Sequence, residues 1–176
     1  MKKSVLLLFF AGCVATGIFG IGRKIPMNRV NDLGQREGYW RDSVGGGFVY
    51  DLYYKGGKKD GLYKRFYRNK LFLFGEYTAD NMSGTWYMFG DEGELRCTID
   101  SIELNKDSIY TGYCQIFCKY KCYCADYYPS GAVKSEGYMV CDEDFMVDFW
   151  EIGEWKYYDE SGNLIKTKDY GDRRTP

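Results

Sequence analysis

The chain of 176 residues contains no histidine and only three prolines. Without histidine, the commonest general base is missing, and so are the Ser–His and Cys–His pairs of nucleophilic catalysis. Because proline is scarce, few positions are barred from a β-ladder. After the first 22 residues we find no long stretch with a 3.6-residue hydrophobic period, the pattern of an amphipathic helix. These absences favour an all-β protein that is not an enzyme.

Basic residues are not concentrated in one stripe. The chain has 24 lysines and arginines against 25 acidic residues, a net charge of −1. Its densest basic stretch, from Lys64 to Lys70, is typical of a solvated face. Nucleic-acid binding would require a basic patch or stripe, so we expect no nucleic-acid partner.

Acidic residues gather between positions 142 and 151, with Asp142, Asp144, Asp148 and Glu151 among them. Paired carboxylates can hydrolyse glycosides, and oxygens at alternate positions can bind calcium. The group is dense and lies between two predicted elements, which favours a solvated loop. We therefore expect no catalytic residues, no cofactor and no metal site, with a carbohydrate-binding or hydrolytic role as an alternative.

A glycine followed two positions later by an aromatic residue recurs along the chain. The four clear pairs are Gly38 with Trp40, Gly61 with Tyr63, Gly84 with Trp86 and Gly153 with Trp155. A second glycine follows nine positions after the first, as Gly47, Gly93 and Gly162. A weaker copy fits the same frame with Cys122, Cys124 and Gly131. Such a period indicates a fold of stacked copies of one small unit.

Each copy predicts a β-hairpin. In the last copy, a short aromatic run at 155–158 precedes a cluster of turn-forming residues at 159–163, and 164–167 returns as a second strand. The second glycine is expected to supply the positive φ of the tight turn. Trp40, Tyr63, Trp86 and Trp155 are expected to form the stacked core. The predicted fold is a set of tandem antiparallel hairpins in an elongated, twisted single sheet.

These repeats resemble the MORN repeat (membrane occupation and recognition nexus), and most closely the bacterial variant in YwqK-type antitoxin-like proteins. The stretches 153–170 and 127–138 are similar to that unit almost throughout. The resemblance covers about 38–170 and implies no catalytic residue. It does imply an alternative function, that of an antitoxin or immunity protein that neutralises a cognate toxin.

Four segments follow from these patterns. They are a signal peptide, lipid attachment segment or membrane anchor at 1–22, a linker at 23–37, the repeat domain at 38–171 and a tail at 172–176, with insertions in the repeat domain near 98–118 and 141–150.

The first residues have the pattern of an export signal, with Lys2 and Lys3 before an apolar run from Val5 to Phe10. The small residues just before Cys13 resemble a bacterial lipobox, which predicts acylation of Cys13 and a lipid-anchored protein of the bacterial cell envelope. Two alternatives remain. The uncharged stretch 4–22 is long enough to span a membrane, and cleavage after 15–17 would release a secreted or periplasmic protein.

Cysteine is concentrated in one part of the chain. Besides Cys13, the cysteines are Cys97, Cys114, Cys118, Cys122, Cys124 and Cys141. An even number in an oxidising compartment favours disulfides, here across the irregular part of the repeats. The alternative is a zinc site formed by Cys114, Cys118, Cys122 and Cys124, although zinc sites usually show C-x2–4-C pairs, often with histidine.

Tyrosine is abundant, with 18 residues. Alternation along strands would place some tyrosines next to the core positions on the opposite face, where they could bind a partner. The candidates are Tyr53, Tyr54, Tyr67, Tyr87, Tyr128 and Tyr157. We expect a binding or scaffold protein that engages a protein or envelope component, with the membrane reached through the N-terminus. Open sheet edges also favour a homodimer.

Overall fold

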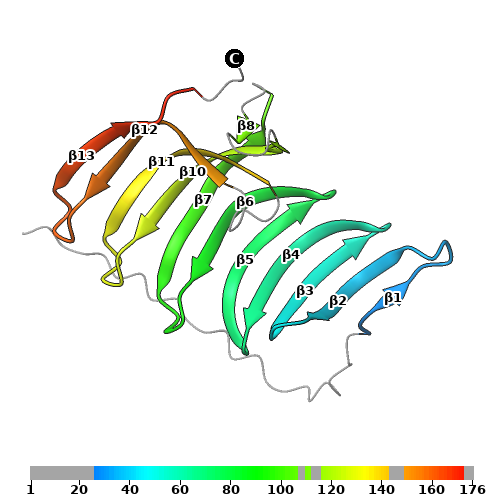
Figure 1. The fold of residues 1–176 in the computed structure, drawn as a ribbon. Helices are drawn as coiled ribbons and strands as arrows, with labels where there is room; N and C mark the ends of the chain where they lie inside the picture. The colour runs from blue at the N-terminus through cyan, green and yellow to red at the C-terminus, as the bar shows by residue number, and fades with distance from the viewer. Residues whose placement is uncertain (1–25, 107–109, 112–115, 143–148, 173–176) are drawn as a thin grey trace, which may run out of the picture.

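The structure, a computed structural model, describes residues 26–106, 110–111, 116–142 and 149–172. The described chain is all β, with eleven of its strands in one antiparallel sheet and β8 and β9 in a separate hairpin. Neighbouring strands in the large sheet follow one another along the chain, apart from β8 and β9, which are inserted between β7 and β10 (Figure 1). The predicted fold class is therefore confirmed.

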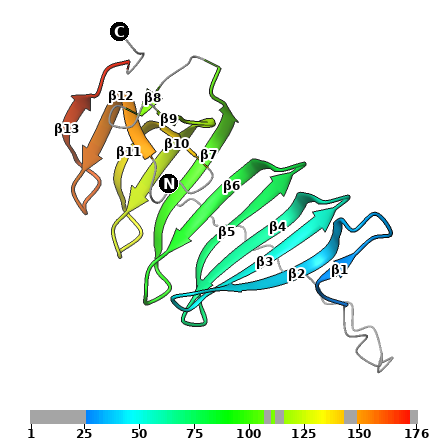
Figure 2. The same cartoon turned by 45° about the vertical axis from the view of Figure 1, so that its right-hand side comes forward.

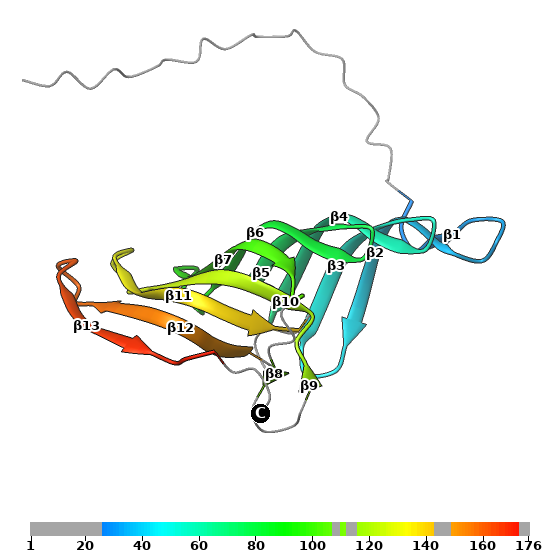
Figure 3. The ribbon, with the colours of Figure 1, turned by 90° about the horizontal axis from the view of Figure 1, so that it is seen from above.

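The strands have the following bounds: β1 Arg29–Val30, β2 Arg36–Val44, β3 Phe48–Lys55, β4 Lys58–Tyr67, β5 Lys70–Thr78, β6 Asn81–Phe89, β7 Leu95–Leu104, β8 Tyr110–Thr111, β9 Ile116–Phe117, β10 Tyr120–Tyr127, β11 Val133–Cys141, β12 Phe149–Tyr158 and β13 Leu164–Asp169. Seen from above, the sheet is twisted and curved, with β1 and β13 at its two ends (Figure 3). In the described part of the chain there is no helix of the length and apolar character needed to cross a membrane.

The two glycines of each repeat have different tasks, as the last copy shows. Gly162 has φ of 82° in the turn between β12 and β13, so the predicted positive φ of the second glycine is confirmed there. Gly153 has φ of 60° inside β12, where the register with β11 shifts. A glycine at that position allows a β-bulge without steric cost. The same shift occurs at the first glycines of β4 and β6.

The aromatic residues of the repeats stand in one row across the sheet. Trp86 lies opposite Ile99, and on β10 and β11 the row continues through Cys124 and Gly137 to Trp155. Trp86 is 1% exposed and Trp155 is 4% exposed. We call this row the ring row, and the side of the sheet that carries it the core face.

Glycines on neighbouring strands make room for the indoles. A Cβ at Gly137 would lie 2.5 Å from Cγ of Trp155, and a Cβ at Gly75 would overlap the indole of Trp86. Tyr63 and Tyr77 pack on Trp86 with ring centroids at 5.3 and 5.1 Å. Among the described residues, the core therefore consists largely of aromatic side chains that pack along one face of the sheet.

Parts of the predicted insertions and of the predicted linker form strands. β7 continues to Leu104, so 98–104 is strand with a bulge at Ser101, where φ is 51°, and the connection that follows contains β8 and β9 (Figure 2). Asn105 Nδ2 donates to the Cys118 carbonyl at 2.9 Å and holds the ends of that connection together. Within 23–37, β1 pairs with β2 and extends the sheet. Most of the second predicted insertion lies outside the described residues.

Replacing Gly75 with alanine should destabilise the protein by about 1–3 kcal/mol, because the new methyl group would overlap the Trp86 indole. Urea unfolding of the wild type and the variant measures this difference. The overlap disappears when the indole is removed. The same glycine substitution should therefore cost less than about 0.5 kcal/mol in a Trp86→Ala background, which itself should lose about 3–5 kcal/mol.

Gly45→Ala is the matched control, because Gly45 has no positive φ and its added Cβ would meet nothing within 4 Å. Equal costs for Gly75→Ala with and without the Trp86 indole would contradict the role given to this contact.

Candidate functional site

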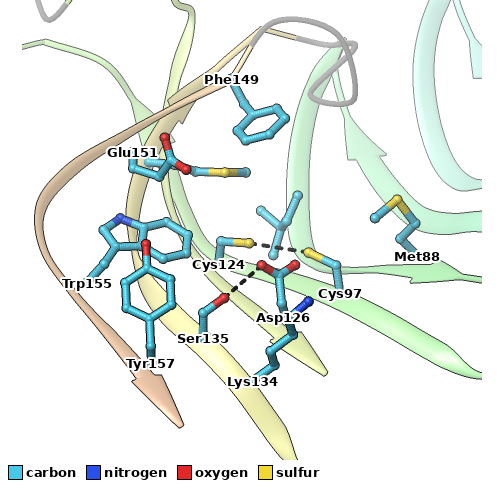
Figure 4. Close-up of a pocket in the computed structure, with 12 residues that line it drawn as sticks. Met88, Cys97, Cys124, Asp126, Lys134, Ser135, Phe149, Glu151, Trp155 and Tyr157 are labelled. Carbon is cyan, nitrogen blue, oxygen red and sulfur yellow. Dashed lines mark hydrogen bonds between the residues drawn. The ribbon is translucent and has the colours of Figure 1, made fainter. Parts of the chain in front are cut away.

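A cavity of about 360 Å³ opens on the core face between β6, β7, β10, β11 and β12. Its apolar wall includes Met88, Ile99, Phe149 and Trp155. Its polar groups come from Cys97, Cys124, Asp126, Lys134, Ser135 and Glu151 (Figure 4). Concave sites with an apolar wall and a few convergent polar groups are typical of ligand binding.

The cavity lies where the ring row is interrupted. In the weaker repeat, Cys124 takes the place that Trp86 and Trp155 have in their copies. A thiol fills much less space than an indole, whereas the space over the next residue of the row, Gly137, is taken by the indole of Trp155. The departure from the repeat pattern therefore leaves the space that forms the cavity.

Three polar side chains stand side by side on the floor of the cavity. Asp126 on β10 lies directly opposite Cys97 on β7 and Ser135 on β11. The Ser135 hydroxyl donates to Oδ2 of Asp126 at 3.0 Å. Cys124 lies two residues from Asp126 on the same face, with its Sγ 3.3 Å from Sγ of Cys97 (Figure 4). Sequence reasoning missed Asp126 and Ser135, because only strand register brings them to the thiols.

The structure describes five cysteines, all of them buried, and no disulfide joins any two of them: Cys97, Cys118, Cys122, Cys124 and Cys141. Cys122 and Cys141 have sulfur atoms 3.6 Å apart, so neither this pair nor Cys97 and Cys124 forms the predicted disulfides in the structure. The reason is that both pairs are diagonal in the ladder, since Cys97 lies opposite Asp126 and Cys122 lies opposite Met139, and diagonal neighbours are about 7–8 Å apart, farther than a disulfide usually spans. Cys13 and Cys114 lie outside the described residues.

Two of these thiols have strongly raised pKa values. A hydrogen bond with Cys97, together with burial, raises the pKa of Cys124 far above its ordinary value. A hydrogen bond with Cys141 and burial do the same to the pKa of Cys122. Both groups are therefore neutral thiols at physiological pH.

The six candidate tyrosines divide between the two faces of the sheet. Tyr53, 47% exposed, and Tyr87 lie on the face opposite the core, whereas Tyr54 is buried in the core. Tyr67 and Tyr157 are on the core face, and Tyr128 follows β10 and donates to the Tyr158 carbonyl at 2.9 Å. Strand alternation separates neighbours such as Tyr53 and Tyr54.

Basic side chains lie over the rings of the core face. Arg36 stacks on Trp40 at 4.4 Å, Lys59 on Tyr77 at 4.6 Å and Arg65 on Phe48 at 4.5 Å. At the other end of the sheet, Lys166 lies 4.4 Å from the Tyr157 ring and Lys168 lies 3.9 Å from the Tyr170 ring. Cation–π contacts of this kind hold positive charge close to an apolar surface. The core face therefore combines rings and cations from β2 to β13.

The acids at 142–151 are only partly described. Glu151 lines the cavity, and Asp142 follows the last residue of β11. Asp144 and Asp148 lie outside the described residues, so the predicted solvated loop stays a prediction.

On the opposite face, one carboxylate is held by a close ion pair. Asp51, 6% exposed, accepts from Nε and Nη2 of Arg41 at 2.6 and 2.7 Å. Burial alone would raise the pKa of Asp51, but the hydrogen bonds from Arg41 and Tyr39 and the charge of Arg41 bring that pKa below its ordinary value. This pair joins β2 to β3 beside the N-terminal end of the sheet.

No protein-family model, curated protein or solved structure matches this chain. The resemblance to MORN repeats therefore stays a prediction, and the function has to be argued from the geometry of the chain itself.

The lowered pKa of Asp51 predicts a specific acid sensitivity. Because the folded-state pKa lies below the unfolded value of about 3.9, the stabilisation is fully present above that pH and is lost as the pH falls through the folded-state pKa. Urea unfolding at neutral and acid pH should show a smaller acid-induced loss of stability in Asp51→Asn than in the wild type.

Glu160→Gln, in the exposed turn between β12 and β13, serves as the control and should keep the wild-type acid dependence. An Asp51→Asn protein with the full wild-type acid dependence would show that this ion pair does not contribute.

Proposed function

We propose that this protein is an exported, lipid-anchored and non-enzymatic binding protein of the bacterial cell envelope. It engages a protein or envelope component that bears anionic groups, through the core face of its sheet. The observation that carries the proposal is the series of cations over rings on that face, from Arg36 on β2 to Lys168 on β13.

The core face suits a large partner because it extends from β2 to β13 and carries half-buried rings such as Trp40 and Tyr157 beside the exposed Lys168. Among the described residues there is no helix, and the only other sheet is the short β8–β9 hairpin. Part of the opposite face, in contrast, is covered where Cys118 packs on Val140 and Ile152. An extended repeat surface of this kind is typical of proteins that bind large partners.

The charge distribution supports an anionic partner. The whole chain has a net charge of −1, so it has no general attraction for anions. The cations on the core face are nevertheless brought together by register, since Lys59 lies opposite Tyr54, Lys166 opposite Tyr157 and Lys168 opposite Trp155. Rings with adjacent cations offer both apolar contact area and charge to carboxylates or phosphates.

A binding role without catalysis is supported by the residues of the chain. Histidine is absent, so the Ser–His and Cys–His pairs of nucleophilic catalysis cannot form within the chain. Export and anchoring are supported by Lys2 and Lys3, the apolar run 5–10 and the lipobox-like residues before Cys13.

The core-face cations should determine partner binding. In the triple variant Lys59→Gln, Lys166→Gln and Lys168→Gln, we expect binding to fall about tenfold, because each surface charge contributes up to about 1 kcal/mol. The measurement is photo-cross-linking in intact cells from a probe at Tyr50 on the core face, with a probe at Tyr53 for the opposite face. Only the Tyr50 probe should yield a partner, and added salt should reduce the yield.

The matched control carries three lysine substitutions on the opposite face: Lys64→Gln, Lys121→Gln and Lys156→Gln. It should change the yield less than about twofold, the scale of an ordinary surface substitution. A partner captured from Tyr53 alone, or equal losses in the two triple variants, would refute the proposed binding face.

Acylation of Cys13 should anchor the protein. We expect the protein from its native membrane to have the mass of an acylated chain that begins at Cys13, and Cys13→Ser to remove the acyl mass and most membrane association. Intact-mass spectrometry and membrane fractionation measure these two effects. Arg29→Gln, in the exposed short strand β1, is the control and should remain anchored. Recovery of an unmodified full-length chain would refute the lipid anchor.

A further inference from the structure

The floor of the cavity brings together three metal-binding side chains. Sγ of Cys97, Sγ of Cys124 and a carboxylate oxygen of Asp126 all lie within 4.8 Å of one another. They come from two neighbouring strands, with Cys97 on β7 and the other two on β10, and all three side chains point to the core face (Figure 4). Two thiols with a carboxylate form a donor set suited to zinc.

The separation of the two sulfur atoms fits a shared metal ion better than a covalent bond. Two sulfur atoms bound tetrahedrally at about 2.3 Å from one zinc ion lie about 3.8 Å apart. The sulfur atoms of Cys97 and Cys124 are 3.3 Å apart, so they would have to separate by about 0.5 Å. A disulfide would require them to approach by more than about 1.2 Å, to a bond length of about 2.05 Å. Metal binding therefore needs the smaller rearrangement.

Ser135 positions the carboxylate. Its hydroxyl donates to Oδ2 of Asp126 at 3.0 Å, which leaves the other oxygen of the carboxylate for an ion. Hydrogen bonds of this kind to a ligating carboxylate fix its orientation in metal sites. The charge is also balanced locally, because two thiolates and a carboxylate around a divalent ion have a net charge of −1, and Lys134 lines the same cavity.

A cavity lies beside the three proposed ligands. Structural zinc sites have four protein ligands, whereas three protein ligands leave a position for water or for another molecule. The cavity of about 360 Å³ lies at this open side, with Glu151, Trp155 and Tyr157 on its wall. A water molecule or a small anionic or thiol-containing ligand could therefore complete the coordination.

We propose that Cys97, Cys124 and Asp126 bind one zinc ion, with its fourth coordination position open to the cavity. The ion replaces the two thiol protons, which pass to solvent as two H⁺, so no oxidant or reductant takes part. Ser135 is a positioning residue. This inference is independent of the proposed partner-binding function, because it is argued only from the three donor side chains and the cavity.

The site differs from the zinc site considered from the sequence. That alternative used Cys114, Cys118, Cys122 and Cys124, chosen for their nearness in sequence. In the structure, Cys122 pairs with Cys141 at 3.6 Å and Cys118 packs on Val140. Both Cys122 and Cys141 are fully buried and do not line the cavity, so they are suitable controls.

The test uses the purified full-length chain, reduced and stripped of metal, with Zn²⁺ and Co²⁺ as the only added probes. We expect one zinc per chain by native mass spectrometry, and a thiolate-to-cobalt charge-transfer absorption on addition of Co²⁺. Cys97→Ser and Cys124→Ser should each lose this absorption. Asp126→Asn should keep it but weaken zinc binding at least tenfold, and Ser135→Ala should weaken zinc binding by about tenfold or more.

Cys122→Ser and Cys141→Ser should bind zinc and Co²⁺ like the wild type. A cooperative thermal melt of each variant without metal shows whether it folds, and Asp126→Asn, which keeps both thiols, tests the site even where a serine variant does not fold. A reduced wild-type chain that binds no zinc would overturn the proposal. It would also be overturned by a native chain in which Cys97 and Cys124 form a disulfide and no zinc is present, or by unchanged zinc affinity in Asp126→Asn.

Discussion

The packing of aromatic rings against glycines on neighbouring strands is the interaction on which the rest of this structure depends. In the described part of the chain this open sheet has no helix to cover its apolar face, so the rings of successive repeats cover one another. Trp86 lies over Gly75 and against Tyr63 and Tyr77, and Trp155 lies over Gly137. These contacts require a side chain of the largest kind next to a position with none, which is why glycine and the aromatic residues recur together along the chain.

The candidate site follows from a local failure of that same pattern. At the repeat that contains Cys124, a thiol takes the place of the ring, so the ring row has no indole on β10. The space that remains is lined by Cys97, Asp126 and Ser135, which register places opposite one another. The repeats with an aromatic residue in the ring row stabilise the sheet, and the repeat with Cys124 in that place leaves the cavity.

The cations of the core face have a related origin. Rings that lie flat on a single sheet remain partly open on their outer side, and arginine and lysine side chains cover them while their charges stay near solvent. The same side chains thus stabilise this face of the sheet and form the surface that we propose for partner binding. The opposite face is held in a different way, as the buried carboxylate of Asp51 and its ion pair with Arg41 show.

The sequence by itself determined the fold class, the hairpin repeats and the turn glycines, because these depend on local periodicity and on the backbone freedom of glycine, as Gly162 illustrates. Strand alternation was visible in the same way, but it could not tell which of Tyr53 and Tyr54 would be buried. Only the tertiary structure decided that Cys97, Cys124, Asp126 and Ser135 meet, and that Cys122 lies with Cys141. The physical reason is register: residues 97 and 126 become neighbours through backbone hydrogen bonds between strands that a long connection separates, and the length of that connection does not determine which residues pair.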